Sequence, residues 1–262
     1  MFNAELNDRS TEKLKRYCEG KKVLLVGNAA SLFNHSYGDM IDQYDVVVRF
    51  GKGVPTEENR KYIGSKTDVW FFGGLRASMF RSWKKAKFKV FNYTQISLYN
   101  PASASLSFPS CMATKQFQIY KDYFVMGDSD THKHLISKIY GKVNKSDWKA
   151  SPRISQGVLC ALYFDEIINT QSSLDFVGFD FFDSVVKFQL DGKNKQIYSW
   201  HIPVPVDNNE HNPHGAEQEK KYIIEMIESS GGKMKIHPMN STLPKEVSEK
   251  LIKEYRPGAT LR

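Results

Sequence analysis

The sequence predicts an α/β fold: a single Rossmann-like, doubly wound, mainly parallel sheet that carries a lid segment. Short and almost wholly apolar runs, such as KVLLV at Lys22–Val26, are typical of strands that are buried on both faces. These runs alternate with stretches of helical length, which is the pattern of βαβ units. The 262 residues, 40% of them hydrophobic, are enough for one large core. We find no linker, so we expect one domain over residues 1–262.

The first half of the chain supplies five of the expected strands. Ser10 is a suitable N-cap for a first helix through Tyr17, and Gly20 is a suitable terminator. The expected strands are Lys22–Val26, Asp45–Phe50, Thr67–Phe72, Phe88–Tyr93 and Tyr123–Met126. Between them we expect a loop with a helical turn at Pro55–Gly64 and helices at Gly73–Trp83 and Ser129–Tyr140.

The stretch Ser151–Phe182 is the centre of the prediction. Its polar start is followed by apolar residues at helical spacing from Val158 to Ile168, and then by a short strand, Leu174–Val177. A helix N-terminus presents free N–H groups to an anion. The carboxyl end of a strand in an open α/β sheet faces the ligand crevice. The stretch therefore predicts an anion cradle and, at Asp180, a carboxylate that binds hydrogen-bond donors.

The last third of the chain predicts a lid and a base. Residues 181–212 have mixed strand character and lie between a strand and a helix, as active-site lids often do. Asn212 is a suitable N-cap and Pro213 a suitable first residue for the next helix, which puts His214 in its first turn. The positive helix end would keep His214 neutral and able to act as a general base. The remaining elements are a helix at Glu217–Glu228, a strand at Lys233–His237, and a tail or surface helix over 243–262.

Composition and charge limit the partners and the cellular compartment that we expect. The net charge of +8 and the pI near 9.2 fit either solvated lysines or an anionic partner, and Arg81–Lys89 is the densest basic segment. Three cysteines without a motif fit a reducing compartment. The N-terminus has no apolar signal region, and no run approaches the ~18 apolar residues of a membrane span. We expect a cytoplasmic protein whose membrane contact, if any, is peripheral at the inner membrane.

Other short motifs are not specific alone. Gly27–Leu32 lets a phosphate approach the backbone closely but departs from GxGxxG, which argues against a dinucleotide fingerprint. Asp128–Asp130 is a DxD, and its residues also serve as helix caps. His211 and His214 lack the spacing of a zinc-binding HExxH, so we expect no metal.

In combination these pieces resemble the sialyltransferases, which use a CMP-activated sugar. Gly27-Asn28-x-x-Ser31-Leu32 and the following Asp45–Phe50 are similar to the long motif of that family. Arg153–Gly157 with Leu174–Phe181 is similar to its short motif, and His214-x4-Glu219 matches its very short motif. The resemblance covers residues 22–237 and implies the GT-A-variant form of the fold.

The resemblance also implies roles for individual residues. Asn28 and Ser31 would contact the phosphate and sugar of the nucleotide. The other predicted ligand contacts are Ser155, Gln156 and Gly157 for the phosphate and the donor's carboxylate, with Arg153 nearby, and Asp180 for the ribose hydroxyls. His214 would be the base of an inverting transfer, and neither metal nor cofactor would be required.

Departures from the family pattern bear on the donor. The long motif usually ends R-x-N, but here Gly51 follows Arg49-Phe50, so Asn59 or Asn92 would replace the missing Asn. Phe182 stands where bacterial members have a phosphate-binding Tyr, a role that Tyr198 in the lid could take. The donor is therefore CMP-sialic acid or CMP-Kdo, the donor of a lipopolysaccharide Kdo transferase.

The acceptor would be a glycan or glycolipid, reached by peripheral contact with an anionic membrane, and no nucleic acid would bind. Two other functions stay open from sequence alone. A Rossmann-like methyltransferase or nucleotide-dependent enzyme would use Gly27–Ser31 as its cofactor loop. A nucleic-acid binder without catalysis would use the basic segments.

Overall fold

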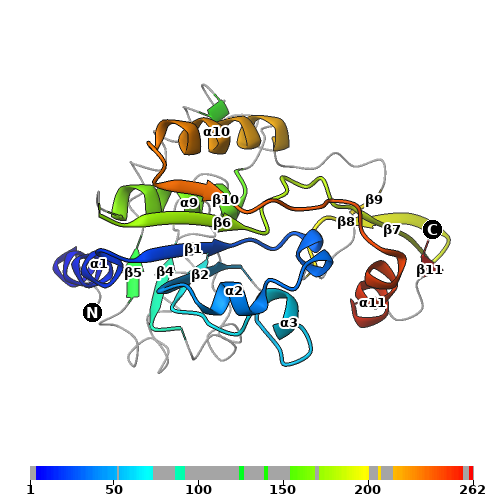
Figure 1. Cartoon of the computed structure of the whole chain (residues 1–262). Helices are drawn as coiled ribbons and strands as arrows, with labels where there is room; N and C mark the ends of the chain where they lie inside the picture. The colour runs from blue at the N-terminus through cyan, green and yellow to red at the C-terminus, as the bar shows by residue number, and fades with distance from the viewer. Residues whose placement is uncertain are drawn as a thin grey trace.

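The computed structural model describes residues 4–51, 53–72, 86–91, 124–126, 139–140, 154–168, 171–200, 206–207, 215–255 and 260–261. Within these residues the centre of the fold is a seven-stranded sheet of order β10-β6-β1-β2-β3-β4-β5, in which every pairing is parallel. Its strands are β1 Lys22–Val26, β2 Val46–Phe50, β3 Val69–Phe72, β4 Phe88–Phe91, β5 Phe124–Met126, β6 Ser173–Val177 and β10 Met234–Ile236. The predicted doubly wound parallel sheet is confirmed (Figure 1).

Alternate residues of the strands feed two separate cores, one on each face of the sheet. Val23 and Leu25 of β1 pack with helices α1 (Ala4–Cys18), α9 (Gln156–Ile167) and α10 (Ala216–Ser229). Leu24 and Val26 pack on the other face, with the 3-10 helix η1 (Ala30–Asn34) and with α2 (Gly38–Asp42), α3 (Arg60–Ile63) and α11 (Lys245–Tyr255). Strands buried on both faces explain why β1 is apolar from Val23 to Val26 and β2 from Val46 to Val48.

A second sheet lies beyond the carboxyl ends of the main strands (Figure 1). It is antiparallel, of order β11-β7-β8-β9, and is made of β7 Val186–Leu190, β8 Lys193–Ile197, β9 Val206–Asp207 and β11 Thr260–Leu261. Its hairpin turns at Asp191-Gly192, where both residues have positive φ, and Asp-Gly is a preferred pair for such a turn. Three of its strands come from the segment predicted as a lid, and β11 comes from the far end of the chain.

Two predicted helix starts are wrong. The first helix begins at Ala4, so Ser10 lies inside it, is fully buried, and is no N-cap. The helix predicted at Glu217–Glu228 begins at Ala216 with Gly215 as its N-cap, so neither Asn212 nor Pro213 starts it, and His214 precedes the cap. The carbonyl of Gly215 accepts the N–H of Glu219 at 2.9 Å, as expected of an N-cap residue. The good capping residues Ser10 and Asn212-Pro213 therefore do not set the starts of α1 and α10.

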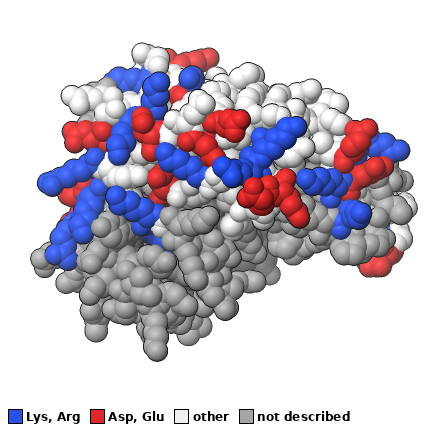
Figure 2. Space-filling view, turned by 60° about the horizontal axis from the view of Figure 1, so that its bottom comes forward, with Lys and Arg blue, Asp and Glu red and all other residues white. Residues whose placement is uncertain are grey.

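One lysine of the basic segment Arg81–Lys89 is buried and is neither solvated nor available to an anionic partner. Lys89 lies in β4 and is fully buried, and its ammonium donates to the carbonyl of Ala86 at 2.6 Å. Burial lowers the Lys89 pKa to about 8. Over the described part of one face, Lys and Arg alternate with Asp and Glu (Figure 2). None of the described helices is long and apolar enough to span a bilayer.

A polar network links β6 to the segment after β10. The Tyr44 hydroxyl donates to the buried carboxylate of Asp175 at 2.6 Å and lies 2.8 Å from Nε2 of His237. Because the Tyr44 proton goes to Asp175, Nε2 of His237 is the donor to the Tyr44 oxygen. Burial and the nearby Lys235 ammonium lower the pKa of His237, while Asp175 opposes the shift.

Candidate active site

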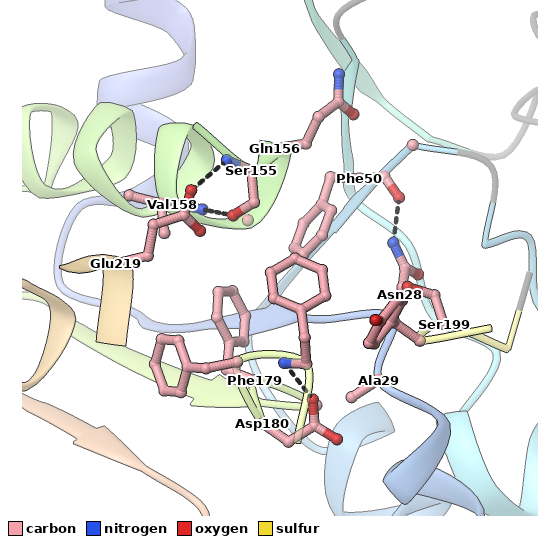
Figure 3. A pocket seen from close by; sticks show the side chains of 16 residues that line it. Asn28, Ala29, Phe50, Ser155, Gln156, Val158, Phe179, Asp180, Ser199 and Glu219 are labelled. Carbon is pink, nitrogen blue, oxygen red and sulfur yellow. Dashed lines mark hydrogen bonds between the residues drawn. The ribbon is translucent and has the colours of Figure 1, made fainter. Parts of the chain in front are cut away.

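A pocket of about 280 Å³ lies at the carboxyl ends of the central strands. From β1 the chain adds β2 to β5 on one side, whereas β6 and β10 are added on the other side. The order of strands therefore reverses between β1 and β6, and such a switch point is where open α/β sheets bind ligands. The turns after β1 and β6, the N-terminus of α9, and residues Tyr198 and Ser199 of the second sheet's segment line the pocket (Figure 3).

The turns that follow β1 and β6 touch each other through glycine. The N–H of Gly27 donates to the carbonyl of Val177 at 2.7 Å, and the N–H of Ala29 donates to Gly178 at 3.3 Å. A Cβ on Gly27 would lie 2.0 Å from the Gly178 oxygen, so this approach requires glycine. The two turns thus form one continuous floor of backbone at the base of the pocket.

Asn28 is held in the wall by two other loops. Its side-chain amide donates to the carbonyl of Phe50 at 3.0 Å, and its own carbonyl accepts the N–H of Trp200 at 3.2 Å. Gly53 packs so closely on Asn28 that a Cβ there would lie 2.2 Å from Oδ1. The position of Asn28 therefore depends on the loop after β2 and on the second sheet's segment.

The N-terminus of α9 opens into the pocket. Ser155 is the N-cap, and its hydroxyl accepts the N–H of Val158 at 3.3 Å. Gln156 and Gly157, the first two helical residues, line the cavity with Ser155. Backbone N–H groups at a helix start and the helix dipole favour an anion at this place.

Glu219 of α10 contributes a carboxylate to the same wall. It is 1% exposed, and its Oε1 accepts the N–H of Ser155 at 2.6 Å and the hydroxyl of Tyr140 at 2.9 Å. Figure 3 shows it beside Ser155, on the opposite side of the pocket from Asn28. From the sequence, Glu219 was identified only as the last residue of the very short motif, His214-x4-Glu219, and no role in the site was predicted for it. Its spacing from His214 was the signal that could have identified it as a site residue.

Asp180 lies at the floor, next to the end of β6, and is 9% exposed. Its Oδ2 accepts the Ser31 hydroxyl at 2.7 Å, the Ser184 N–H at 3.2 Å and the Ser184 hydroxyl, and its Oδ1 accepts the Phe182 N–H at 3.1 Å. Burial raises the pKa of Asp180, and these four hydrogen bonds oppose the rise. Ser31 is fully buried behind Asp180 and does not line the pocket.

Aromatic rings cover much of the remaining wall. Phe50 and Phe179 meet edge to face, with centroids 5.7 Å apart, and Phe182 meets Tyr198 in the same way at 6.0 Å. Phe181 also lines the cavity. Such a wall suits a planar or partly apolar ligand, with polar groups at its two ends.

Six of the predicted site residues thus lie together in one pocket: Asn28, Ser155, Gln156, Gly157, Asp180 and Tyr198. Asn28 comes from the long motif, Tyr198 from the segment predicted as a lid, and the other four from the short motif. Arg153 and His214 lie outside the described residues, as do the DxD and His211. In the part of the chain that the structure describes, no group of three or more His, Cys, Asp or Glu could hold a metal ion.

Comparison with known proteins decides the family. The model of glycosyltransferase family 29 (sialyltransferase) matches residues 4–161, more than half of the chain. The chain belongs to glycosyltransferase family 29. It is therefore a glycosyltransferase of the sialyltransferase family, and this replaces the methyltransferase and nucleic-acid-binding alternatives.

Two solved structures and one curated relative are also similar to this chain. A mammalian sialyltransferase crystal structure matches with a TM-score of 0.54 at 17% identity, over 84% of this chain and 70% of that one, which shows the same fold. A mammalian sialyltransferase in complex with Gal-β-1-3GalNAc-ortho-nitrophenol is also similar, with a TM-score of 0.48 at 18% identity, over 90% of this chain and 80% of that one. The Arabidopsis thaliana β-1,6-galactosyltransferase GALT29A is 43% identical over 47 residues, which span 18% of this chain and only 12% of the plant enzyme.

The departures from the family 29 pattern can be located in this frame. Gly51, at the place of the usual Asn, lines the pocket beside Phe50. Asn59 lies outside the pocket lining, and its Oδ1 accepts the N–H of Thr56 at 2.7 Å, so it stabilises the turn before α3. Asn92 lies outside the described residues. Among the described residues, Asn28 places a side-chain amide next to Phe50 and Gly51, where it donates to the Phe50 carbonyl.

Arg49 of the long motif is buried and hydrogen-bonded outside the pocket. Its side chain is 2% exposed and donates from Nε to the carbonyl of Lys66 and to the Thr67 hydroxyl, both at 3.0 Å. It therefore fixes the connection between α3 and β3 behind the pocket, rather than lining it.

Proposed function

We propose that the protein transfers a sialic acid or Kdo-type sugar from its CMP donor to a hydroxyl of a glycan or glycolipid, with inversion and without a metal. The observation that carries the proposal is the single pocket in which Asn28, the start of α9 and Asp180 meet. Its dimensions and lining suit one nucleoside monophosphate, with an anion at one end and a diol at the other. Membership of family 29 supports glycosyl transfer as the type of reaction.

The residues would divide the work as follows. The N–H of Gly157 and the cap at Ser155 would receive the phosphate, since both lie at the helix start that faces the pocket. Oδ1 of Asp180, which accepts the N–H of Phe182, would also take a ribose hydroxyl. Ser31, whose hydroxyl is bound to Asp180, would act by positioning that carboxylate.

In the reaction the acceptor oxygen attacks the anomeric carbon from the face opposite CMP. The new C–O bond forms as the bond between the anomeric carbon and the phosphate oxygen breaks, and the electron pair of that bond leaves with CMP. His214 would take the proton of the acceptor hydroxyl, which is the role of a general base. The helix start at Ser155 would stabilise the charge that develops on the phosphate.

A second donor deserves the same test. The local similarity to a β-1,6-galactosyltransferase favours a galactose donor as the alternative. A neutral sugar has no carboxylate, so a galactose donor would leave only the nucleotide phosphates for the helix start.

Cytoplasmic placement and peripheral contact with an anionic membrane remain predictions.

Thermal unfolding with CMP, UDP and buffer, each with and without EDTA, tests the nucleotide. At a ligand concentration of about 100 Kd, binding adds about 2.7 kcal/mol of stability. That corresponds to a rise in Tm of roughly 5–10 °C for a chain of this size. A rise with CMP that survives EDTA supports the proposal, whereas a rise with UDP alone supports the galactose donor.

Donor hydrolysis with CMP-sialic acid, CMP-Kdo and UDP-galactose then identifies the sugar, and His214→Ala tests the base. We expect turnover to fall by about 10²–10⁴-fold while the Tm rise with CMP is kept. His237→Ala is the matched control, because His237 lies in the Tyr44 network outside the pocket. Near-normal turnover of His214→Ala would remove His214 from the mechanism.

A further inference from the structure

The turn that follows Asp180 has an unusual backbone. Phe181 and Phe182 have φ angles of 53° and 68°, and the turn is closed by the Asp183 N–H, which donates to the Asp180 carbonyl at 3.0 Å. Positive φ at both central positions is the pattern of type I′ turns, in which Gly, Asn and Asp dominate. Two consecutive bulky aromatic residues in this region are strained. The turn therefore keeps these side chains at a cost in backbone energy.

Asp180 holds this turn in place. Its carboxylate accepts the N–H of Phe182 and the N–H of Ser184, and it is itself fixed by the hydroxyls of Ser31 and Ser184. Strained backbone persists where the surroundings over-determine it, and such places cluster at ligand sites. The hydrogen bonds explain how the turn is maintained, but not why its two side chains are aromatic.

The two rings have different surroundings. Phe181 packs against the core that lies between the sheet and α9, which accounts for an apolar side chain there. Phe182 lines the pocket, half-buried, and its ring stands at 85° to that of Tyr198 with centroids 6.0 Å apart. Tyr198 follows β8 and is also half-buried in the pocket wall. Two partly exposed rings from separate elements thus meet beside the Asp180 carboxylate.

We propose that Phe182 and Tyr198 form the surface on which the base of the donor nucleotide stacks. The inference rests on the proposed function of this pocket. A nucleotide with its phosphate at the start of α9 and its ribose at Asp180 extends its base away from the helix, along the turn that carries Phe182. Phe182 has no polar atom, so its ring can recognise a flat base but not a phosphate. Phe182, which stands where bacterial members have a phosphate-binding Tyr, would therefore bind the base instead of the phosphate.

The strain makes a distinctive test possible. Phe182→Asn removes the ring but keeps a residue that tolerates positive φ. Its Tm should therefore equal or exceed that of the unsubstituted protein, whereas its affinity for CMP should fall. Stacking of about 1–3 kcal/mol per base corresponds to a loss of about 5- to 150-fold.

The experiment compares the dissociation constants of CMP and ribose 5-phosphate, which lacks the base, by calorimetry. We expect Phe182→Asn, and separately Tyr198→Leu, to weaken CMP by the stated factor and to change ribose 5-phosphate by less than about twofold. Asp191→Asn is the matched control. Asp191 has a φ of 52° in the exposed β7–β8 turn, so its substitution changes a side chain at a positive-φ position away from the pocket and should leave the affinity for CMP unchanged.

The outcomes separate the two proposals. Equal weakening of CMP and ribose 5-phosphate, or unchanged CMP affinity in both variants, overturns base stacking while the nucleotide pocket stands. Binding of neither ligand by the unsubstituted protein overturns the nucleotide pocket and the stacking together. If Phe182→Asn unfolds, Tyr198→Leu alone decides, since Tyr198 has an ordinary backbone.

Discussion

Gly27→Ala tests how closely the two turns at the base of the pocket meet. The added Cβ would lie 2.0 Å from the Gly178 oxygen and 2.5 Å from its carbonyl carbon, both of which are backbone atoms. The turns would have to separate by about 1.4 Å to restore an ordinary contact of 3.4 Å. That movement stretches the bonds from Gly27 to Val177 and from Ala29 to Gly178.

The expected cost combines two effects. Overpacking costs about 1–3 kcal/mol, and a lost backbone hydrogen bond costs about 0.5–1.5 kcal/mol. We therefore expect the free energy of unfolding to fall by about 2–4 kcal/mol, with a fall in Tm of roughly 5–15 °C. CMP affinity should fall as well, because the turn that carries Asn28 moves away from the floor at Asp180.

Urea unfolding, followed by circular dichroism, measures the change. Gly20→Ala is a useful comparison, since a Cβ there meets nothing within 4 Å and only its φ of 68° disfavours alanine. That variant should lose about 1 kcal/mol and no CMP affinity. If Gly27→Ala were no less stable than Gly20→Ala, the close approach of the two turns would be refuted.

Two further predictions concern buried polar groups. Glu219→Ala should lower the free energy of unfolding, measured in urea, by about 1–3 kcal/mol, because the N–H of Ser155 loses its acceptor. Glu219→Gln keeps an acceptor oxygen and should lose clearly less stability. Equal losses in the two variants would contradict this account. The lowered pKa of His237 means that the unfolded chain takes up its proton more readily, so stability should fall as the pH drops below about 6.5, the ordinary histidine value. The decrease in Tm between about pH 7.5 and about pH 5.5 should be smaller in His237→Gln, and an equal decrease in both proteins would show that another group is responsible.

The sequence was sufficient for the sheet and for much of the pocket, and the reason is geometric. Runs such as Lys22–Val26 are apolar because both faces are covered, and parallel strands bring their carboxyl ends to one edge. Residues that follow different strands, such as Asn28 and Asp180, therefore meet even though 152 positions separate them.

What the sequence did not predict depends on contacts between distant segments. Positive φ at Phe181 and Phe182 has no local signal, because the residues that usually mark it are Gly, Asn and Asp. Glu219 reaches the start of α9 only through the packing of two helices. Ser10 shows the reverse error: a good capping residue was expected to start a helix that begins six residues earlier.

The short strand β11 has a practical consequence. Thr260 and Leu261 pair with Gln189 and Phe188, which completes one edge of the sheet whose hairpin leads to Tyr198. An affinity tag, a fluorophore or a surface linker attached beside Leu261 would therefore pull on the substrate side of the enzyme. Deletion of 260–261 would expose the β7 edge to pairing with other chains. Immobilisation through α1, at the opposite end of the sheet (Figure 1), avoids both effects.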